Sequence, residues 1–126
     1  MSVLSAFNTQ LIRFFEDLAE SFPEEREIKM SLEAIQGLKK INPKMICDLF
    51  HEYVYVPLKE PILREDEAFV IAHAKKMIEV QFNEMSVALM IFNKYWPNMS
   101  DNNRQSIWRY LKVLVALCDK VKSVKN

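Results

Sequence analysis

The chain contains a single glycine, Gly37, among its 126 residues. Tight β-hairpins, phosphate-binding loops and nucleophile elbows all use glycine, because a residue without a side chain reaches positive φ and lets the backbone approach a ligand closely. None of these features can be drawn in this sequence. The scarcity of glycine therefore argues against glycine-dependent nucleotide-binding and hydrolase sites.

The segment 95–117 combines the end of one helix with the start of the next. Trp96 stands before Pro97, and proline disfavours the α conformation in the residue that precedes it. Ser100 then offers a side-chain oxygen to the free backbone N–H groups at a helix start. Behind it, apolar residues recur at helical spacing: Ile107, Trp108, Leu111, Leu114, Val115 and Cys118. The pattern predicts a helix–turn–helix corner and a last helix over about residues 101–122.

Three helices are predicted in the first half of the chain. The first, over about residues 2–21, has an apolar stripe with alternating spacings of three and four: Leu4, Phe7, Leu11, Phe14 and Leu18. Pro23 is expected to be the first residue of the second helix, which ends near Lys39 and Lys40. Asn42 is expected to cap a short third helix that begins at Pro43.

Two further prolines, Pro57 and Pro61, predict an extended connection over residues 55–61. Helical spacing resumes at Arg64 with acidic residues in the first turn. It indicates either one bent helix over about residues 64–96 or two helices broken near residues 80–83. We therefore expect one all-α domain over residues 1–126, a compact orthogonal or irregular bundle of five to six helices. Aromatic residues of the first and last helices and the helix ending at Trp96 should form its core.

Formal charge is zero, from 17 basic and 17 acidic residues, which gives no overall bias toward nucleic acid. Residues 1–63 carry a net charge of −3 and residues 64–126 a net charge of +3. Cys47 and Cys118 are far apart in the sequence and outside any C-x-x-C pattern, so we expect two buried free thiols. No signal peptide is evident, and no apolar run approaches the ~20 residues of a membrane span. An intracellular protein, in the cytoplasm or nucleus, is the expectation.

The candidate catalytic and metal-binding residues have structural interpretations. His51-Glu52 resembles the start of a zinc-protease motif, but Tyr55 stands where the second histidine is needed. His73 lies far along the chain and is expected to be an ordinary helix residue. The acidic residues 65–67 suit a helix start, where carboxylates meet free backbone donors. We expect no catalytic residue, no metal site and no cofactor.

The last helix is the best candidate for a binding surface. We predict that four basic residues fall mostly on the side away from its apolar face: Arg104, Arg109, Lys112 and Lys120. Such a face is suited to phosphates or to an acidic partner, and it is also what an ordinary solvated helix surface looks like. The apolar stripe of the first helix is a second candidate, for a dimer or a partner groove.

Several short blocks of the sequence resemble a family of small helical proteins encoded by large DNA viruses of algae and protists. These blocks are Phe22-Pro23-Glu24, Asn42-Pro43-Lys44, Tyr53-Val54-Tyr55, Asp66-Glu67-Ala68-Phe69, Tyr95-Trp96 and Ile107-Trp108-Arg109-Tyr110-Leu111. The family has no assigned activity. The resemblance therefore implies a viral, intracellular, helical protein and transfers no catalytic residue.

Together these observations predict a non-enzymatic protein of a large DNA virus, interacting through an apolar or basic helix face, as a virion component or a host-directed adaptor. Its partner would be a viral or host protein, and self-association is an open alternative. The second hypothesis is weak, sequence-independent binding of nucleic acid by the last helix together with a lysine cluster: Lys39, Lys40 and Lys44.

Overall fold

Every regular element in the described part of the chain is a helix, as the sequence predicts. The computed structural model describes residues 2–80, 90 and 93–124. In chain order the elements are α1 (Val3–Ser21), α2 (Arg26–Ile41), α3 (Pro43–Phe50), the π-helical turn η1 (His51–Tyr55), α4 (Val56–Leu63), α5 (Glu67–Val80), the 3-10 turn η2 (Trp96–Asn98) and α7 (Asp101–Val124). The predicted break near residues 80–83, and most of the apolar pattern behind it, lies outside the described residues.

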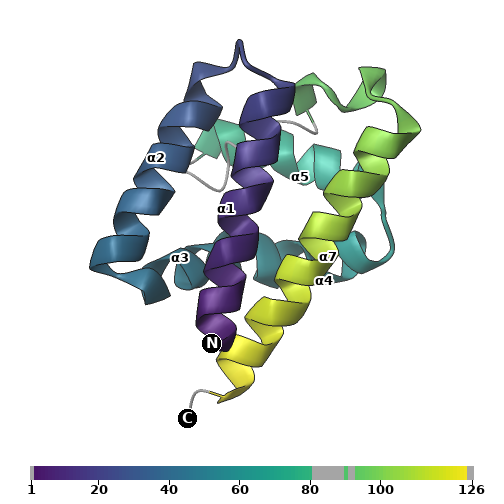
Figure 1. Cartoon of the computed structure of the whole chain (residues 1–126). Helices are drawn as coiled ribbons and strands as arrows, with labels where there is room; N and C mark the ends of the chain where they lie inside the picture. Colours follow the sequence, from purple (N-terminus) through teal and green to yellow (C-terminus); the bar gives the residue numbers. More distant parts are fainter. Residues whose placement is uncertain (1, 81–89, 91–92, 125–126) are drawn as a thin grey trace.

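Helices α1 and α7 lie side by side and run in opposite directions, and α2 packs against α1 on its other side (Figure 1). Behind this layer, α3 and α4 cross near the end where α1 begins and α7 ends, and α5 lies behind the opposite half (Figure 1). Helix α4 contacts both α5 and α7. The result is the irregular bundle that the sequence predicts. None of its described helices combines the length and apolar character needed to cross a membrane.

Serine side chains cap the two long helices, and the cap of α7 is the predicted one. The Ser2 hydroxyl accepts a hydrogen bond from the Ser5 N–H at 3.0 Å, and α1 then runs to the expected stop at Phe22. The Ser100 hydroxyl accepts from the Asn103 N–H at 3.2 Å. These bonds satisfy backbone donors that have no partner within the helix. Asn42 holds the capping position of α3, with Pro43 as its first residue, but no hydrogen bond from its side chain caps the helix.

The second helix begins later than predicted. Pro23 and Glu24 lie in a turn, and α2 starts at Arg26. Glu25 stands at the capping position in an extended conformation, and its side chain is buried. Its carboxylate accepts hydrogen bonds from the Lys94 ammonium at 2.5 Å and from the Tyr95 hydroxyl. This contact with a distant segment holds Glu25 outside the helix, which spacing along the sequence does not reveal.

The predicted extended connection over residues 55–61 is wrong, because the backbone stays helical from Pro43 to Leu63. Pro57 has no N–H for the helical ladder. The turn before it widens into η1, where the Val56 N–H donates to the His51 carbonyl five residues back. Leu58 and Ile62, which lie one helical turn apart on α4, are both fully buried. Burial of this segment outweighs the preference of residues before proline for extended backbone.

The turn from α4 to α5 shows why helical spacing misplaced the start of α5. Glu65 has a φ of 54°, in the left-handed region, and its N–H donates to the Ile62 carbonyl at 3.0 Å. The Asp66 N–H donates to the Pro61 carbonyl at 2.8 Å, which completes a Schellman motif. The Asp66 carboxylate then accepts from the Phe69 N–H at 3.2 Å and caps α5. Glu65 and Asp66 thus end one helix and begin the next, instead of lying within a first turn.

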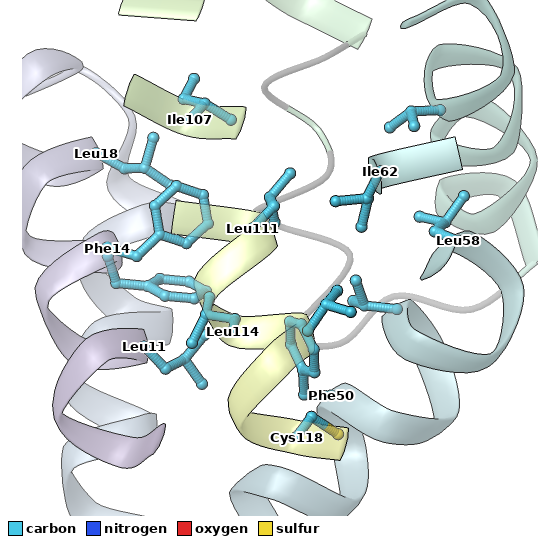
Figure 2. Packing of buried hydrophobic residues seen from close by; sticks show 14 of the residues in the cluster. Leu11, Phe14, Leu18, Phe50, Leu58, Ile62, Ile107, Leu111, Leu114 and Cys118 are labelled. Atoms are coloured by element: carbon cyan, nitrogen blue, oxygen red, sulfur yellow. The ribbon is translucent and has the colours of Figure 1, made fainter. Parts of the chain in front are cut away.

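The hydrophobic core lies between α1 and α7 and extends to the α3–α4 side (Figure 2). Figure 2 shows side chains from α1 meeting those of α7, with residues of α3 and α4 on the far side: Leu11, Phe14, Leu18, Phe50, Leu58, Ile62, Ile107, Leu111, Leu114 and Cys118. Trp96 and Trp108 are buried and pack edge to face, with ring centroids 5.3 Å apart. The predicted core aromatics of α1 and α7, and Trp96 itself, are confirmed, and most of the helix predicted to end at Trp96 lies outside the described residues. The apolar stripe of α1 is used inside the fold, against α2, α3 and α7.

Candidate interaction surfaces

Arg104, predicted to face away from the packing, is part of the fold. Its Nε and Nη2 atoms donate to the Trp96 carbonyl at 3.1 and 2.8 Å, and Nη2 also donates to the Pro97 carbonyl at 3.2 Å. The guanidinium lies over the Trp96 ring, with 5.3 Å from its central carbon to the ring centroid. Because α7 starts only a few residues after η2, the side chain reaches back and satisfies carbonyls of that turn. The predicted outward orientation of Arg104 is therefore wrong.

Lys112 is also held by a contact within the fold. Its ammonium lies 2.6 Å from the Glu65 carboxylate, and this hydrogen bond holds the pKa of Glu65 below its ordinary value. The ion pair joins the middle of α7 to the turn between α4 and α5. Lys112 therefore lies on the surface, but its ammonium is paired with a carboxylate that is far away in the sequence.

Arg109 and Lys120 are exposed on the outward side of α7, as predicted. Arg109 borders a depression of about 280 Å³ between α1 and α7. There the Tyr110 hydroxyl donates a hydrogen bond to Asp17, and burial together with this carboxylate raises the pKa of Tyr110 to about 12. The acidic group beside Arg109, the Asp17 carboxylate, is therefore already paired with Tyr110. The four predicted residues do not form one continuous basic face.

The fold brings lysines of three helices to one end of the molecule, where α2 and α7 end and α3 begins (Figure 1). We call these residues the basic end: Lys39, Lys40, Lys44, Lys120 and Lys122. Asp48 of α3 ties the group together, because its carboxylate lies 2.5 Å from Lys122 and 3.6 Å from Lys44. Asp119 is a second carboxylate nearby. The basic end still has a net positive charge, because its lysines outnumber these two carboxylates.

A mostly apolar groove of about 340 Å³ lies between α5 and the segment η1–α4. Its lining consists of apolar, aromatic and a few polar residues: Glu52, Tyr53, Val56, Pro57, His73, Lys76 and Met77. Glu52 and Lys76 place opposite charges at this groove, one on each wall. We call this feature the α4–α5 groove.

Large apolar side chains stand exposed on the same two helices. Val56 is 65% exposed, Leu63 45% and Phe69 49%. Val56 and Leu63 are seven residues apart and share one face of α4, and Phe69 and His73 are four apart on α5. Because Val56 and His73 both line the α4–α5 groove, this spacing puts Leu63 and Phe69 along the same side of the helix pair. Phe69 is therefore available at the surface.

The two histidines lie on different elements and make different contacts. His51 stacks on Tyr55 with ring centroids 4.9 Å apart. His73 lines the α4–α5 groove, and its Nε2 atom is buried with no hydrogen-bond partner among the described residues. Burial lowers the pKa of both imidazoles, which favours their neutral forms. Within residues 2–80, 90 and 93–124, no three histidine, cysteine or acidic side chains are arranged to hold a metal ion.

We did not identify the α4–α5 groove from the sequence, because Val56 and Pro57 fall in the segment expected to be extended. The groove could have been found by continuing the helical spacing through that segment, because this spacing places Val56 and Leu63 on one helix face. No protein-family model, curated protein or solved structure matches this chain. Its surfaces are therefore the basis for assigning a function.

Proposed function

We propose that this chain is a non-catalytic protein-interaction domain whose α4–α5 groove binds an apolar helical segment of a partner protein. The observation that carries the proposal is that the exposed Val56 lines the groove, while two further exposed apolar side chains, Leu63 and Phe69, stand on or beside the same two helices. Large apolar side chains grouped around a hollow lose contact with water when a partner covers them, and this favours binding. The apolar stripe of α1, the other candidate, is already covered within the fold.

An amphipathic helix is the partner segment that suits this groove. A helix seated between two helical walls inserts apolar anchors spaced three, four and seven residues apart. Glu52 on one wall and Lys76 on the other favour a segment with opposite charges on its two flanks, which sets its orientation. The resemblance to proteins of large DNA viruses supports a viral or host protein as the partner, inside the infected cell or in the virion.

Charge substitutions in the groove test this function. Val56→Glu and Phe69→Glu each place a carboxylate beside the apolar lining, at positions too exposed to disturb the core. Val113→Glu is the matched control, because Val113 is an exposed valine on α7, outside the groove. Partner binding should fall at least tenfold, roughly 1.4 kcal/mol, in both groove variants and stay unchanged in the control.

Binding is measured by affinity capture from infected cells followed by quantitative mass spectrometry. Circular dichroism checks that the variants are folded. A partner retained by wild type and Val113→Glu but lost from both groove variants supports the proposal. Equal loss from the control, or full retention by both groove variants, contradicts it. Sedimentation of the purified chain decides whether that partner is a second copy, because a dimer using this groove would dissociate in Val56→Glu.

The basic end supports a second candidate function, weak binding of nucleic-acid phosphates. The observation that favours it is the joining of two lysine groups that are distant in the sequence, through Asp48 of α3. Such contacts release counterions, so retention on DNA should collapse between about 50 and 200 mM salt. Lys39→Glu with Lys120→Glu should abolish that retention, and Arg109→Glu, exposed elsewhere on α7, should reduce it less. Retention on DNA that does not depend on salt would exclude this candidate. So would an equal loss of retention in the Lys39→Glu, Lys120→Glu double variant and in Arg109→Glu.

A further inference from the structure

The two cysteines, 71 positions apart in the sequence, meet inside the fold. Cys47 of α3 and Cys118 of α7 have Sγ atoms 3.9 Å apart, and neither side chain is exposed to solvent. The sequence predicted two separate buried thiols, and the burial is confirmed. Their contact was not predicted, because it depends on how α3 packs against the last turns of α7, which are far away in the sequence.

Positive charge lies close to this thiol pair. Lys122 is one helical turn from Cys118, and Lys44 is one turn from Cys47. The hydrogen bond with Cys118 lowers the pKa of Cys47, and the ammonium groups of Lys122 and Lys44 lower it further against the opposing effects of burial and of the Asp48 carboxylate. The pKa of Cys118 is raised, first by the same hydrogen bond and then by burial. Cys47 is therefore the thiol that ionises first and acts as the nucleophile.

We propose that Cys47 and Cys118 are an oxidation site that forms a reversible intramolecular disulfide between α3 and α7. The oxidant is a small-molecule disulfide, which reaches the buried thiols when the last turns of α7 open locally from α3. The Cys47 thiolate attacks one sulfur of that disulfide, which forms a mixed disulfide and releases one small-molecule thiolate. Cys118, after losing its proton, attacks the Cys47 sulfur and releases the second thiolate. The protein loses two electrons and two protons, and the oxidant becomes two thiols.

The native geometry favours the second step. A disulfide needs its sulfurs about 2.05 Å apart, so these atoms must close a gap of roughly 2 Å, which small side-chain rotations on two packed helices can supply. The new bond joins α3 to α7 beside the existing contact of Asp48 with Lys122. Oxidation should therefore stabilise the fold by restricting the unfolded chain. This proposal is independent of the α4–α5 groove and does not rest on the proposed function.

The test is the redox equilibrium of the full chain in buffers of reduced and oxidised glutathione. The ratio of disulfide to dithiol form, measured by mass spectrometry after acid quenching and alkylation, is compared in native buffer and in strong denaturant. We expect the intramolecular disulfide to be favoured at least tenfold more in the native protein. By linkage, the oxidised chain should resist unfolding more than the reduced chain by the same factor.

Single variants identify the species that form. Cys118→Ser should stop at the mixed disulfide of Cys47 with glutathione, and Cys47→Ser, which lacks the attacking thiol, should remain reduced. Equal equilibrium ratios in native buffer and in denaturant would overturn the proposal, as would a native protein that yields only mixed disulfide. Both outcomes are read from the wild-type chain, so the conclusion does not depend on whether either serine variant folds.

Discussion

The Arg104 guanidinium lies over the Trp96 ring and donates two hydrogen bonds to the Trp96 backbone carbonyl. One side chain thus fixes the start of α7 against the turn that precedes it. Because the Trp96 indole is almost fully buried, the contact anchors the part of the core that the last third of the sequence supplies.

Arg104→Ala should lower the free energy of unfolding by about 1–2 kcal/mol, because it removes charge-assisted hydrogen bonds and a cation–π contact. Arg104→Lys should recover part of the loss, since an ammonium keeps the charge but lacks the planar fork. Arg109→Ala is the control, at an exposed position on the same helix, and should change stability by less than about 0.5 kcal/mol. Urea unfolding measures all three. Similar losses for Arg104→Ala and Arg109→Ala would refute the anchoring role.

The buried carboxylate of Glu25 should make stability depend on pH. Hydrogen bonds from Lys94 and then Tyr95 hold the pKa of Glu25 below its ordinary value of 4.5. A group whose pKa is lower in the folded state binds its proton more tightly in the unfolded state. Its contribution is therefore present above pH 4.5 and is lost as the pH falls further, toward the folded-state pKa.

Glu25→Gln removes this titration. The variant should be less stable than wild type at pH 7, and the difference should shrink steadily below pH 4.5. Chemical denaturation at a series of pH values measures it. Glu33→Gln, at an exposed position on α2, the helix that follows Glu25, should differ little from wild type at every pH. A Glu25→Gln effect that is constant with pH would mean that the carboxylate charge has no role in these contacts.

Gly37 lowers the stability of α2, and no close packing contact requires a glycine at this position. It lies within the helix, and a β-carbon added there would meet no atom within 4 Å. Gly37→Ala should therefore raise the free energy of unfolding by about 0.5–1 kcal/mol, because alanine loses less backbone entropy in a helix. Ala34→Gly, at an exposed position in the same helix, should lower it by a similar amount. Thermal unfolding measures both variants, and a destabilising Gly37→Ala would indicate that the glycine has another role.

The parts of the fold that the sequence predicts are those decided by local chemistry. Caps and apolar periodicity lie within a few residues of each other, so the apolar stripe placed the start of α1 correctly and the predicted cap Ser100 placed that of α7. Proline misled the prediction at residues 55–61, because local backbone preference there is outweighed by burial of residues such as Leu58.

The candidate sites were harder to predict, because they depend on which residues meet in space. Arg104 and Lys112 look outward on a helical projection, yet the Trp96 carbonyl and the Glu65 carboxylate hold them. A projection shows the angle of a residue around its helix and says nothing of the neighbouring elements. The α4–α5 groove and the Cys47–Cys118 contact were missed for the same reason, because both depend on which helices pack against each other.

The most direct test of the proposed binding site is photo-crosslinking from a single position. A benzophenone amino acid in place of Val56 sits at the α4–α5 groove, and the same residue in place of Val113 samples an exposed site on α7. We predict a discrete crosslinked protein from position 56 in infected cells, absent from position 113 and lost when Phe69→Glu is added. Identical products from both positions, or a product from position 56 that survives Phe69→Glu, would contradict the assignment of the groove as the binding site.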